Sequence, residues 1–303
     1  MRLIRVTVPE GKAHDIAQIA FANGVEQVTI RAEEARAAKG ETRRMEALEA
    51  TVATPVAKRF LDGLLSAPAF DPATMSVAQR KPVSIVTHQP IGKLTRPVFH
   101  PATDVMEDLW QFSHVTISLV LRILIAAAML AHGVLHDHLI LMVGGLLFIP
   151  VLPPLMAIGF GAMTGRWRLA GQGLLTCLLG LGLVLIGGAL VGWIEPRPIE
   201  FQDFPELKPS FIIAALVGIA AALANSDDAG KRELIGLAAA AQISLVPIWF
   251  GLAWALGTIS KEVAVERALS LGLNLAAIVV TSALTYTLIG YKKGSLARLP
   301  ADA

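Results

Sequence analysis

The sequence predicts an α-helical polytopic membrane domain of about six transmembrane helices, preceded by a small cytosolic α+β domain. Three observations support this fold class. The 303-residue chain is 54% hydrophobic with a mean hydropathy of +0.60, which is too apolar for an ordinary soluble domain. Its long stretches without Asp, Glu, Lys or Arg lie almost wholly after residue 113. Residues 1–88 instead alternate short strand-like and helix-like patterns.

The region 1–88 has the element order of a ferredoxin-like domain, β-α-β-β-α-β. Period-2 alternation indicates strands, and apolar residues three to four positions apart indicate helices. The polar stretch 34–43 is expected to be a loop. The expected elements are strand 3–8, helix 14–21, strand 26–31, strand 46–52, helix 55–65 and strand 82–87.

The N-terminus has no continuous apolar run, so no cleaved secretory signal is expected and the first domain should stay in the cytoplasm. A proline-containing linker follows, and an acidic helix start at 103–107 then predicts a juxtamembrane helix. The predicted organisation is a cytosolic domain 1–88, a linker with juxtamembrane helix 89–113, a transmembrane domain 114–291 and a cytosolic tail 292–303.

Six apolar stretches are long enough, or nearly so, to cross a bilayer core, which takes about 20 helical residues. Arg122 is the only formal charge well within them. Lys and Arg are moderately enriched in the short connections on the side of the N-terminus, which predicts that both termini are cytoplasmic. The predicted spans are 115–135, 139–165, 169–194, 209–226, 234–260 and 268–291.

The spans contain a weak internal repeat. A shift of 93 positions places Ile125–His132 over Gly218–Asn225, and Pro154 over Pro247. Because each half has three spans, the two halves must enter the membrane from opposite sides. Inverted repeats of this kind are typical of secondary transporters, whose interrupted helices line the central site.

Prolines and polar residues at the centre of the second and fifth spans are the best candidates for a solute or ion path. Proline removes a backbone donor and leaves a carbonyl unpaired, which hydrocarbon penalises unless protein or a water-lined cavity satisfies it. The alternative is that the prolines only kink packed helices. The predicted path residues are Arg122, Pro150, Pro153, Pro154, Gln242, Ser244, Pro247 and Asn274.

Three of these residues have an alternative role. The Arg122 guanidinium would suit an anionic solute, but it lies close enough to one end of its span to snorkel to the interface. Gln242 and Asn274 are strongly polar side chains at depth that could bond across helices instead of contacting a solute.

Two further features receive no site. His132 and His136 could share a helix face and bind a metal, but the neighbouring sequence supplies no second group of ligands, so no metal is assigned. The single cysteine, Cys177, is expected to pack within a span. No cofactor is assigned, and the scattered basic residues predict no nucleic-acid binding.

The order of several motifs resembles the DUF389 family of hydrophobic bacterial and archaeal proteins. The resemblance runs over about residues 1–291, and the chain departs from the family pattern at Val246-Pro247, where the family has a small residue and a double proline. It implies the fold and a bacterial or archaeal inner-membrane location, and it supplies no activity. The motifs are GGLLFIPVLPPLMAIGFGAMTG, ALVGIAAALANSDD, ELIGLAAAAQISLVPIWFGLA and LSLGLNLAAIVV.

The sequence therefore predicts an integral inner-membrane transporter or channel for a small solute or ion. The alternative is a membrane-anchored sensor or scaffold whose cytosolic domain binds an effector or partner. No enzyme is expected, because the catalytic motifs G-x-S-x-G, H-E-x-x-H and the P-loop do not occur. The expected partners are the lipid bilayer, the solute and further copies of the chain.

Overall fold

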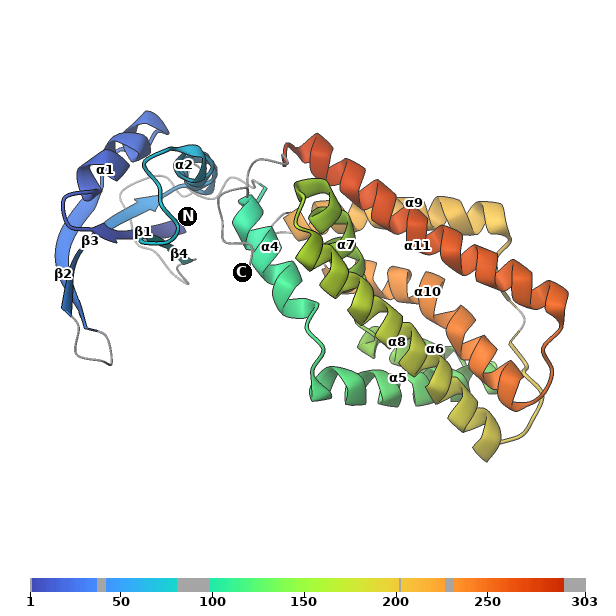
Figure 1. The fold of residues 1–303 in the computed structure, drawn as a ribbon. Helices are drawn as coiled ribbons and strands as arrows, with labels where there is room; N and C mark the ends of the chain where they lie inside the picture. The colour runs from blue at the N-terminus through green and yellow to red at the C-terminus, as the bar shows by residue number, and fades with distance from the viewer. Residues whose placement is uncertain (1, 37–41, 81–98, 202, 227–231, 292–303) are drawn as a thin grey trace. The chain divides into compact units, whose positions relative to one another are not determined.

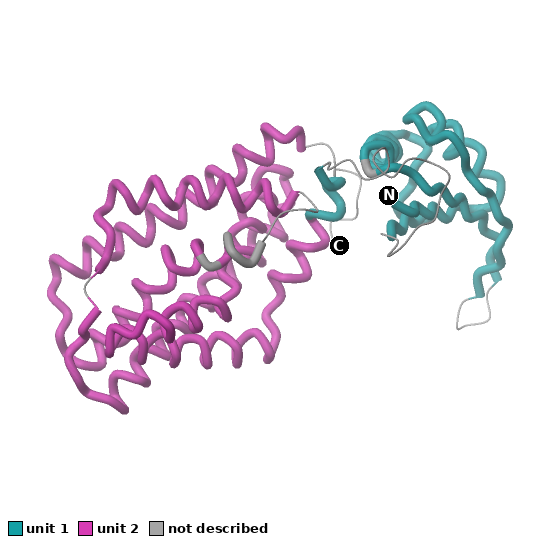
Figure 2. The backbone as a smooth tube through the Cα atoms, turned by 180° about the vertical axis from the view of Figure 1, so that it is seen from behind, with its two compact units in different colours: residues 1–105, 292–303 teal, residues 106–291 magenta. Residues whose placement is uncertain are grey.

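The computed structural model describes residues 2–36, 42–80, 99–201, 203–226 and 232–291. The chain divides into two compact units, Met1–Val105 with Lys292–Ala303, and Met106–Tyr291 (Figure 2). Each unit is described by itself below.

The first unit is a four-stranded antiparallel sheet with two helices (Figure 1). Its strand order is β2-β3-β1-β4, and on the central strand Val6 lies opposite Leu48 and Val77. Alternate β1 residues are buried in a core that includes Ile16 and Phe60 of the helices. The elements are β1 (Arg2–Pro9), α1 (Ala13–Ala22), β2 (Thr29–Arg36), β3 (Thr42–Val52), α2 (Thr54–Ser66) and β4 (Ser76–Arg80).

One prediction for this unit differs from the structure, and another falls on residues that the structure does not describe. The expected loop 34–43 is wrong for residues 34–36 and 42–43, which continue β2 and β3. These residues are all exposed, and Glu34 lies opposite Arg44, so the polar sequence here belongs to exposed paired strands. The fourth strand is Ser76–Arg80, whereas the expected strand 82–87 lies outside the described residues.

The second unit is a helical bundle (Figure 1). Five of its described helices are long and apolar enough to cross a membrane. The pair α6 and α7, bent by 44° at its break, makes a sixth if it is counted as one span. Helix α4 (Ala102–Phe112) leads into this unit, and its other helices are α5 (Ile117–Leu135), α6 (Leu139–Phe148), α7 (Leu152–Thr164), α8 (Trp167–Ile194), α9 (Leu207–Ser226), α10 (Arg232–Ala255) and α11 (Lys261–Ile289).

The bundle has two ends. We call the end with residues 113–116 and 165–166 the Gly165 end, and the end with residues 136–138 and 195–206 the Glu195 end. Helices α5, α8 and α10 run from the Gly165 end to the Glu195 end, and α7, α9 and α11 run back (Figure 1). Small residues bring these helices close together, as membrane helices commonly require.

Candidate functional site: cavities at both ends of the bundle

A cavity of about 320 Å³ lies toward the Glu195 end, between α9, α10 and α11. At its inner wall the Asn274 amide donates to Ser210 Oγ at 2.8 Å, and Ser210 Oγ donates to Gln242 Oε1 at 3.0 Å. Asn274 is only 2% exposed, and its Oδ1 has no hydrogen-bond partner among the residues that the structure describes. The structure therefore joins Gln242 and Asn274, and adds Ser210, which the sequence analysis missed.

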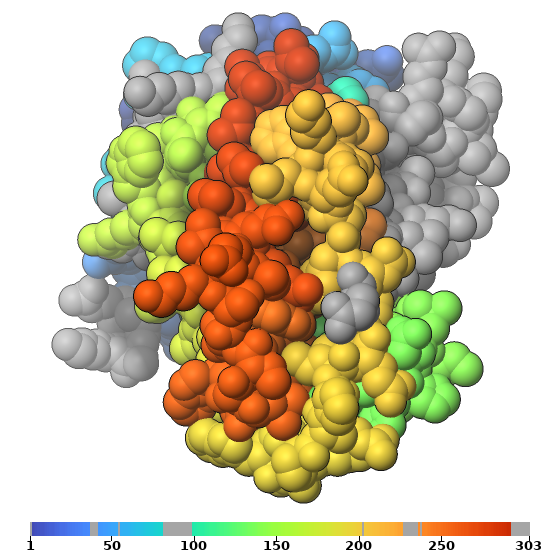
Figure 3. Space-filling view, turned by 90° about the vertical axis from the view of Figure 1, so that its right-hand side faces the viewer, coloured from blue at the N-terminus to red at the C-terminus, as the bar shows by residue number. Residues whose placement is uncertain are grey.

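The mouth of this cavity carries charged groups of both signs, Glu206, Glu266 and Arg267. The Arg267 guanidinium carbon lies 3.6 Å from the Phe204 ring centroid and 3.8 Å from that of Trp249. Such stacking holds the cation by attraction to the ring faces. Figure 3 looks onto this end, where the yellow segment before α9 and the orange beginning of α11 are seen.

A second cavity, of about 490 Å³, lies toward the Gly165 end. It is bordered by α4, the α6–α7 break and the last turns of α9, where Asn225 lies. Arg122, Pro150 and Pro153, which were predicted to belong to one path, all line this cavity. Arg122 is exposed to it and not buried in the bundle.

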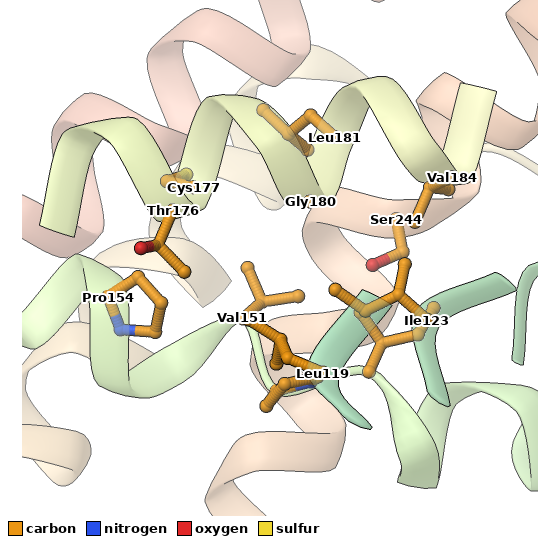
Figure 4. A pocket seen from close by; sticks show the side chains of 12 residues that line it. Leu119, Ile123, Val151, Pro154, Thr176, Cys177, Gly180, Leu181, Val184 and Ser244 are labelled. Atoms are coloured by element: carbon orange, nitrogen blue, oxygen red, sulfur yellow. The ribbon is translucent and has the colours of Figure 1, made fainter. Parts of the chain in front are cut away.

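A third cavity, of about 20 Å³, lies between α5, α7, α8 and α10 (Figure 4). It has room for about one water molecule. Pro154 and Ser244 line it, together with Thr176 and Cys177 of α8. Ser244 is fully buried, and in the described part of the chain its Oγ has no hydrogen-bond partner. Pro150 borders both this cavity and the one at the Gly165 end.

Pro247 lies inside α10 and interrupts its hydrogen bonding without ending the helix. Its ring nitrogen cannot donate to the Ile243 carbonyl four residues earlier. The predicted path residues other than Pro247 are thus divided among the three cavities. Pro247 lies on α10, closer to the Glu195 end than the α10 residues that line the cavities.

Two contacts between the halves of the bundle, α5–α8 and α9–α11, match each other. A Cβ on Gly251 of α10 would meet the Leu185 carbonyl oxygen and lie 2.8 Å from Ala189 N, both on α8. The position 92 residues before Gly251 is Gly159 of α7, and the positions 94 residues after Leu185 and Ala189 are Val279 and Ala283 of α11. There a Cβ on Gly159 of α7 would lie 3.0 Å from the carbonyl oxygen of Val279 and 3.5 Å from the nitrogen of Ala283 on α11.

The two halves differ at the ends of their helices. In the first half the Ser113 carbonyl accepts hydrogen bonds from Gln172 Nε2, at 3.1 Å, and from Thr176 Oγ1. These bonds join the connection between α4 and α5 to α8. The positions 93 or 94 residues further on are Glu206, Glu266 and Ser270, and they line the open cavity at the Glu195 end.

One pair of equivalent positions explains part of this difference. A Cβ on Gly173 of α8 would lie 2.6 Å from the Pro154 carbonyl oxygen, so α7 and α8 are in close contact there. The position 94 residues later is Arg267, a large side chain whose guanidinium stacks on the ring of Trp249 of α10.

The long apolar helices and the cavities between them define a polytopic helical membrane protein that also carries a small α+β unit. Residues 146–280 match the family model described as a domain of unknown function, DUF389, which supports the resemblance to that family noted from the sequence. The matched segment contains the α6–α7 break and the Gln242 and Asn274 cluster. No curated protein and no solved structure matches the chain.

Proposed function

We propose that the protein is a transporter for a small polar solute or ion. In this proposal α5–α8 and α9–α11 form two inverted halves, and the solute binds at Ser210, Gln242 and Asn274. One observation carries the proposal: equivalent positions are joined at the Gly165 end of one half and line an open cavity at the Glu195 end of the other. Alternation between two such arrangements would expose the site to each side in turn.

The polar cluster suits a solute that exchanges hydrogen bonds with the protein. The Asn274 Oδ1 has no partner among the described residues, and an unsatisfied buried acceptor costs about 1–3 kcal/mol. A solute donor that bonds to it would recover this cost. The carboxylates of Glu206 and Glu266 and the guanidinium of Arg267 give the entrance groups of both charge signs.

The remaining path residues have roles in this scheme. Pro150 and Pro153 keep the α6–α7 break, and Arg122 faces the cavity of the Gly165 end. Pro154 and Ser244 lie at the small cavity between the two larger ones. Pro247 provides a bending point in α10.

The proposal includes an inner-membrane location with both termini in the cytoplasm, so that the Gly165 end faces the cytoplasm. It also includes a ferredoxin-like fold for the first unit, supported by its element order and strand order. Assembly of several copies and the lack of an enzymatic activity are further parts of it.

The native cysteine provides a direct test. Cys177 is buried beside the small cavity, and it is the single cysteine of the chain. In proteoliposomes a transported solute should change the rate at which a small water-soluble methanethiosulfonate reagent modifies Cys177. The same solute should accumulate in vesicles containing the wild-type protein, and much less in vesicles containing Asn274→Leu. Uptake equal in wild type and variant across a panel of inorganic ions, organic anions and amino acids would refute the proposal.

A second candidate is a membrane-anchored sensor or scaffold. Two observations favour it: β2 is exposed on both faces along nearly its whole length, and a cavity of about 380 Å³ lies beside Arg43 and Arg44 in the first unit. Exposed strand edges are places where another chain can pair. A ligand or partner that stabilises the full-length protein and is not transported would favour this function.

A further inference from the structure

A cluster of three potential metal ligands lies at the Glu195 end. His132 lies in the last turn of α5, His136 follows the last residue of α5, and Glu195 follows the last residue of α8. His132 Nδ1 lies 3.2 Å from Glu195 Oε2, and His136 Nε2 lies 2.9 Å from Glu195 Oε1. The sequence analysis assigned no metal because a further ligand was lacking, and the fold supplies that ligand from 59 residues away.

We propose that His132, His136 and Glu195 bind a zinc-like divalent ion. Their three ligand atoms all lie within 4.8 Å of one another. In a tetrahedral zinc site with bonds of about 2.0–2.1 Å, ligand atoms are about 3.4 Å apart. Small side-chain movements therefore suffice to form the site. Two imidazoles and one carboxylate favour Zn²⁺, Co²⁺ or Ni²⁺ over Mg²⁺ or Ca²⁺, and leave a fourth position for water.

The cluster already attracts a cation. Arg197 Nη1 lies 2.7 Å from His136 Nδ1, and Arg197 Nε lies 3.6 Å from Glu195 Oε1. With Arg197 donating to Nδ1, the ring proton of His136 is assigned to Nε2, which donates to Glu195. To bind the ion through Nε2, the neutral His136 ring gives up its Nε2 proton and takes up a proton at Nδ1, so no net proton is released. The Arg197 side chain is 46% exposed, so it can move away from the arriving ion.

A metal ion bound at this site would also affect the neighbouring segment of the chain. Glu195 begins the segment 195–206, whose last residues line the cavity at the Glu195 end. Phe201 N donates to the Val134 carbonyl at 3.2 Å, which also ties this segment to α5. A bound ion would fasten α5 to the end of α8 and to this segment. The proposal does not depend on whether the protein is a transporter.

The test uses the full-length protein, purified without a histidine tag. Isothermal titration with Zn²⁺ should show one site, absent with Mg²⁺, and Co²⁺ should develop the visible absorption of a four-coordinate ion. His136→Ala and Glu195→Gln should each weaken Zn²⁺ binding by more than about tenfold. His138→Ala is the matched control, because His138 is exposed and lies outside the cluster. It should bind as the wild type does.

Arg197→Ala keeps the proposal testable if a ligand variant does not fold. Removal of the competing guanidinium should tighten Zn²⁺ binding several-fold and raise the zinc-induced increase in Tm. The proposal is overturned if the wild type binds no Zn²⁺, if His138→Ala loses binding as His136→Ala does, or if Arg197→Ala weakens binding.

Discussion

The first half of the bundle, α5–α8, and the second half, α9–α11, contact each other through two matching glycine positions but differ at the ends of their helices. In the first half Gln172 and Thr176 bond to the Ser113 carbonyl. At the equivalent mouth of the second half, Glu206 and Glu266 line a cavity. Neutral amide and hydroxyl donors can close onto a carbonyl, whereas two carboxylates must stay hydrated or find a cation. Removing them from water costs several kcal/mol per ion. Under the proposed function, side chains at the helix ends, and not the packing, would decide which half is open.

The largest predicted effect is on the shared packing. Gly159→Leu and Gly251→Leu should each destabilise the bundle by about 3 kcal/mol or more, because any Cβ would meet the backbone of the facing helix. Thermal unfolding in detergent measures this loss. Gly182→Leu is the control, since a Cβ there meets no atom within 4 Å. Equal stability of Gly251→Leu and Gly182→Leu would contradict the close packing of α8 and α10.

The polar cluster distinguishes the open half from its counterpart. Asn274→Leu removes the amide that bonds to Ser210 and Gln242, and should lower solute uptake by about tenfold, which corresponds to about 1.4 kcal/mol. Thr281→Val is the matched control on the same helix, because the Thr281 hydroxyl bonds to its own helix at the Ala277 carbonyl. If both variants transport equally, the cluster is structural and does not bind the solute.

An exchange of side chains tests whether the helix ends decide the open state. The triple variant Glu206→Ser, Glu266→Gln, Ser270→Thr gives the second half the side chains of the first. Because its carboxylates no longer need hydration, the Glu195 end should close more readily. A cysteine placed at Ala241, which lines this cavity, in a Cys177→Ala background should then be labelled about fivefold more slowly. Unchanged labelling would mean that the backbone arrangement sets the open state.

The reverse change should loosen the hydrogen-bonded helix ends of the first half. Gln172→Leu with Thr176→Val removes both donors to the Ser113 carbonyl, and interhelical hydrogen bonds of this kind contribute about 0.6 kcal/mol each. Modification of Cys177 should therefore become several-fold faster. Thr164→Val is the control, since the Thr164 hydroxyl bonds to the Phe160 carbonyl of its own helix. Slower or unchanged modification of Cys177 would show that these bonds do not hold the end closed.

The sequence predicted those features that depend on local pattern. The apolar stretches gave the long helices, and the prolines at 150, 153 and 154 marked the α6–α7 break. Contacts between distant parts of the chain could not be predicted from the sequence, because tertiary packing decides which helix faces meet. Ser210 joins Asn274 from 64 residues away. Strand β4 at Ser76–Arg80 was not predicted, and the predicted strand 82–87 lies outside the described residues.

The smallest effect is expected in the first unit, where burial of Asp62 on α2 raises the pKa of its carboxyl group, partly offset by Lys58. A raised carboxyl pKa means that the folded state disfavours the charged form, so stability decreases as pH rises from the unfolded pKa through the folded one. Asp62→Asn removes this cost. Hydrogen exchange of the α2 amides in the full-length protein should slow by about threefold at pH 7 relative to wild type. The advantage should vanish below the unfolded pKa, where Asp62 is neutral in both states. Because α2 lies in the other compact unit, the variant should leave Cys177 labelling unchanged. A change in labelling would mean that the open and closed halves of the bundle respond to the first unit.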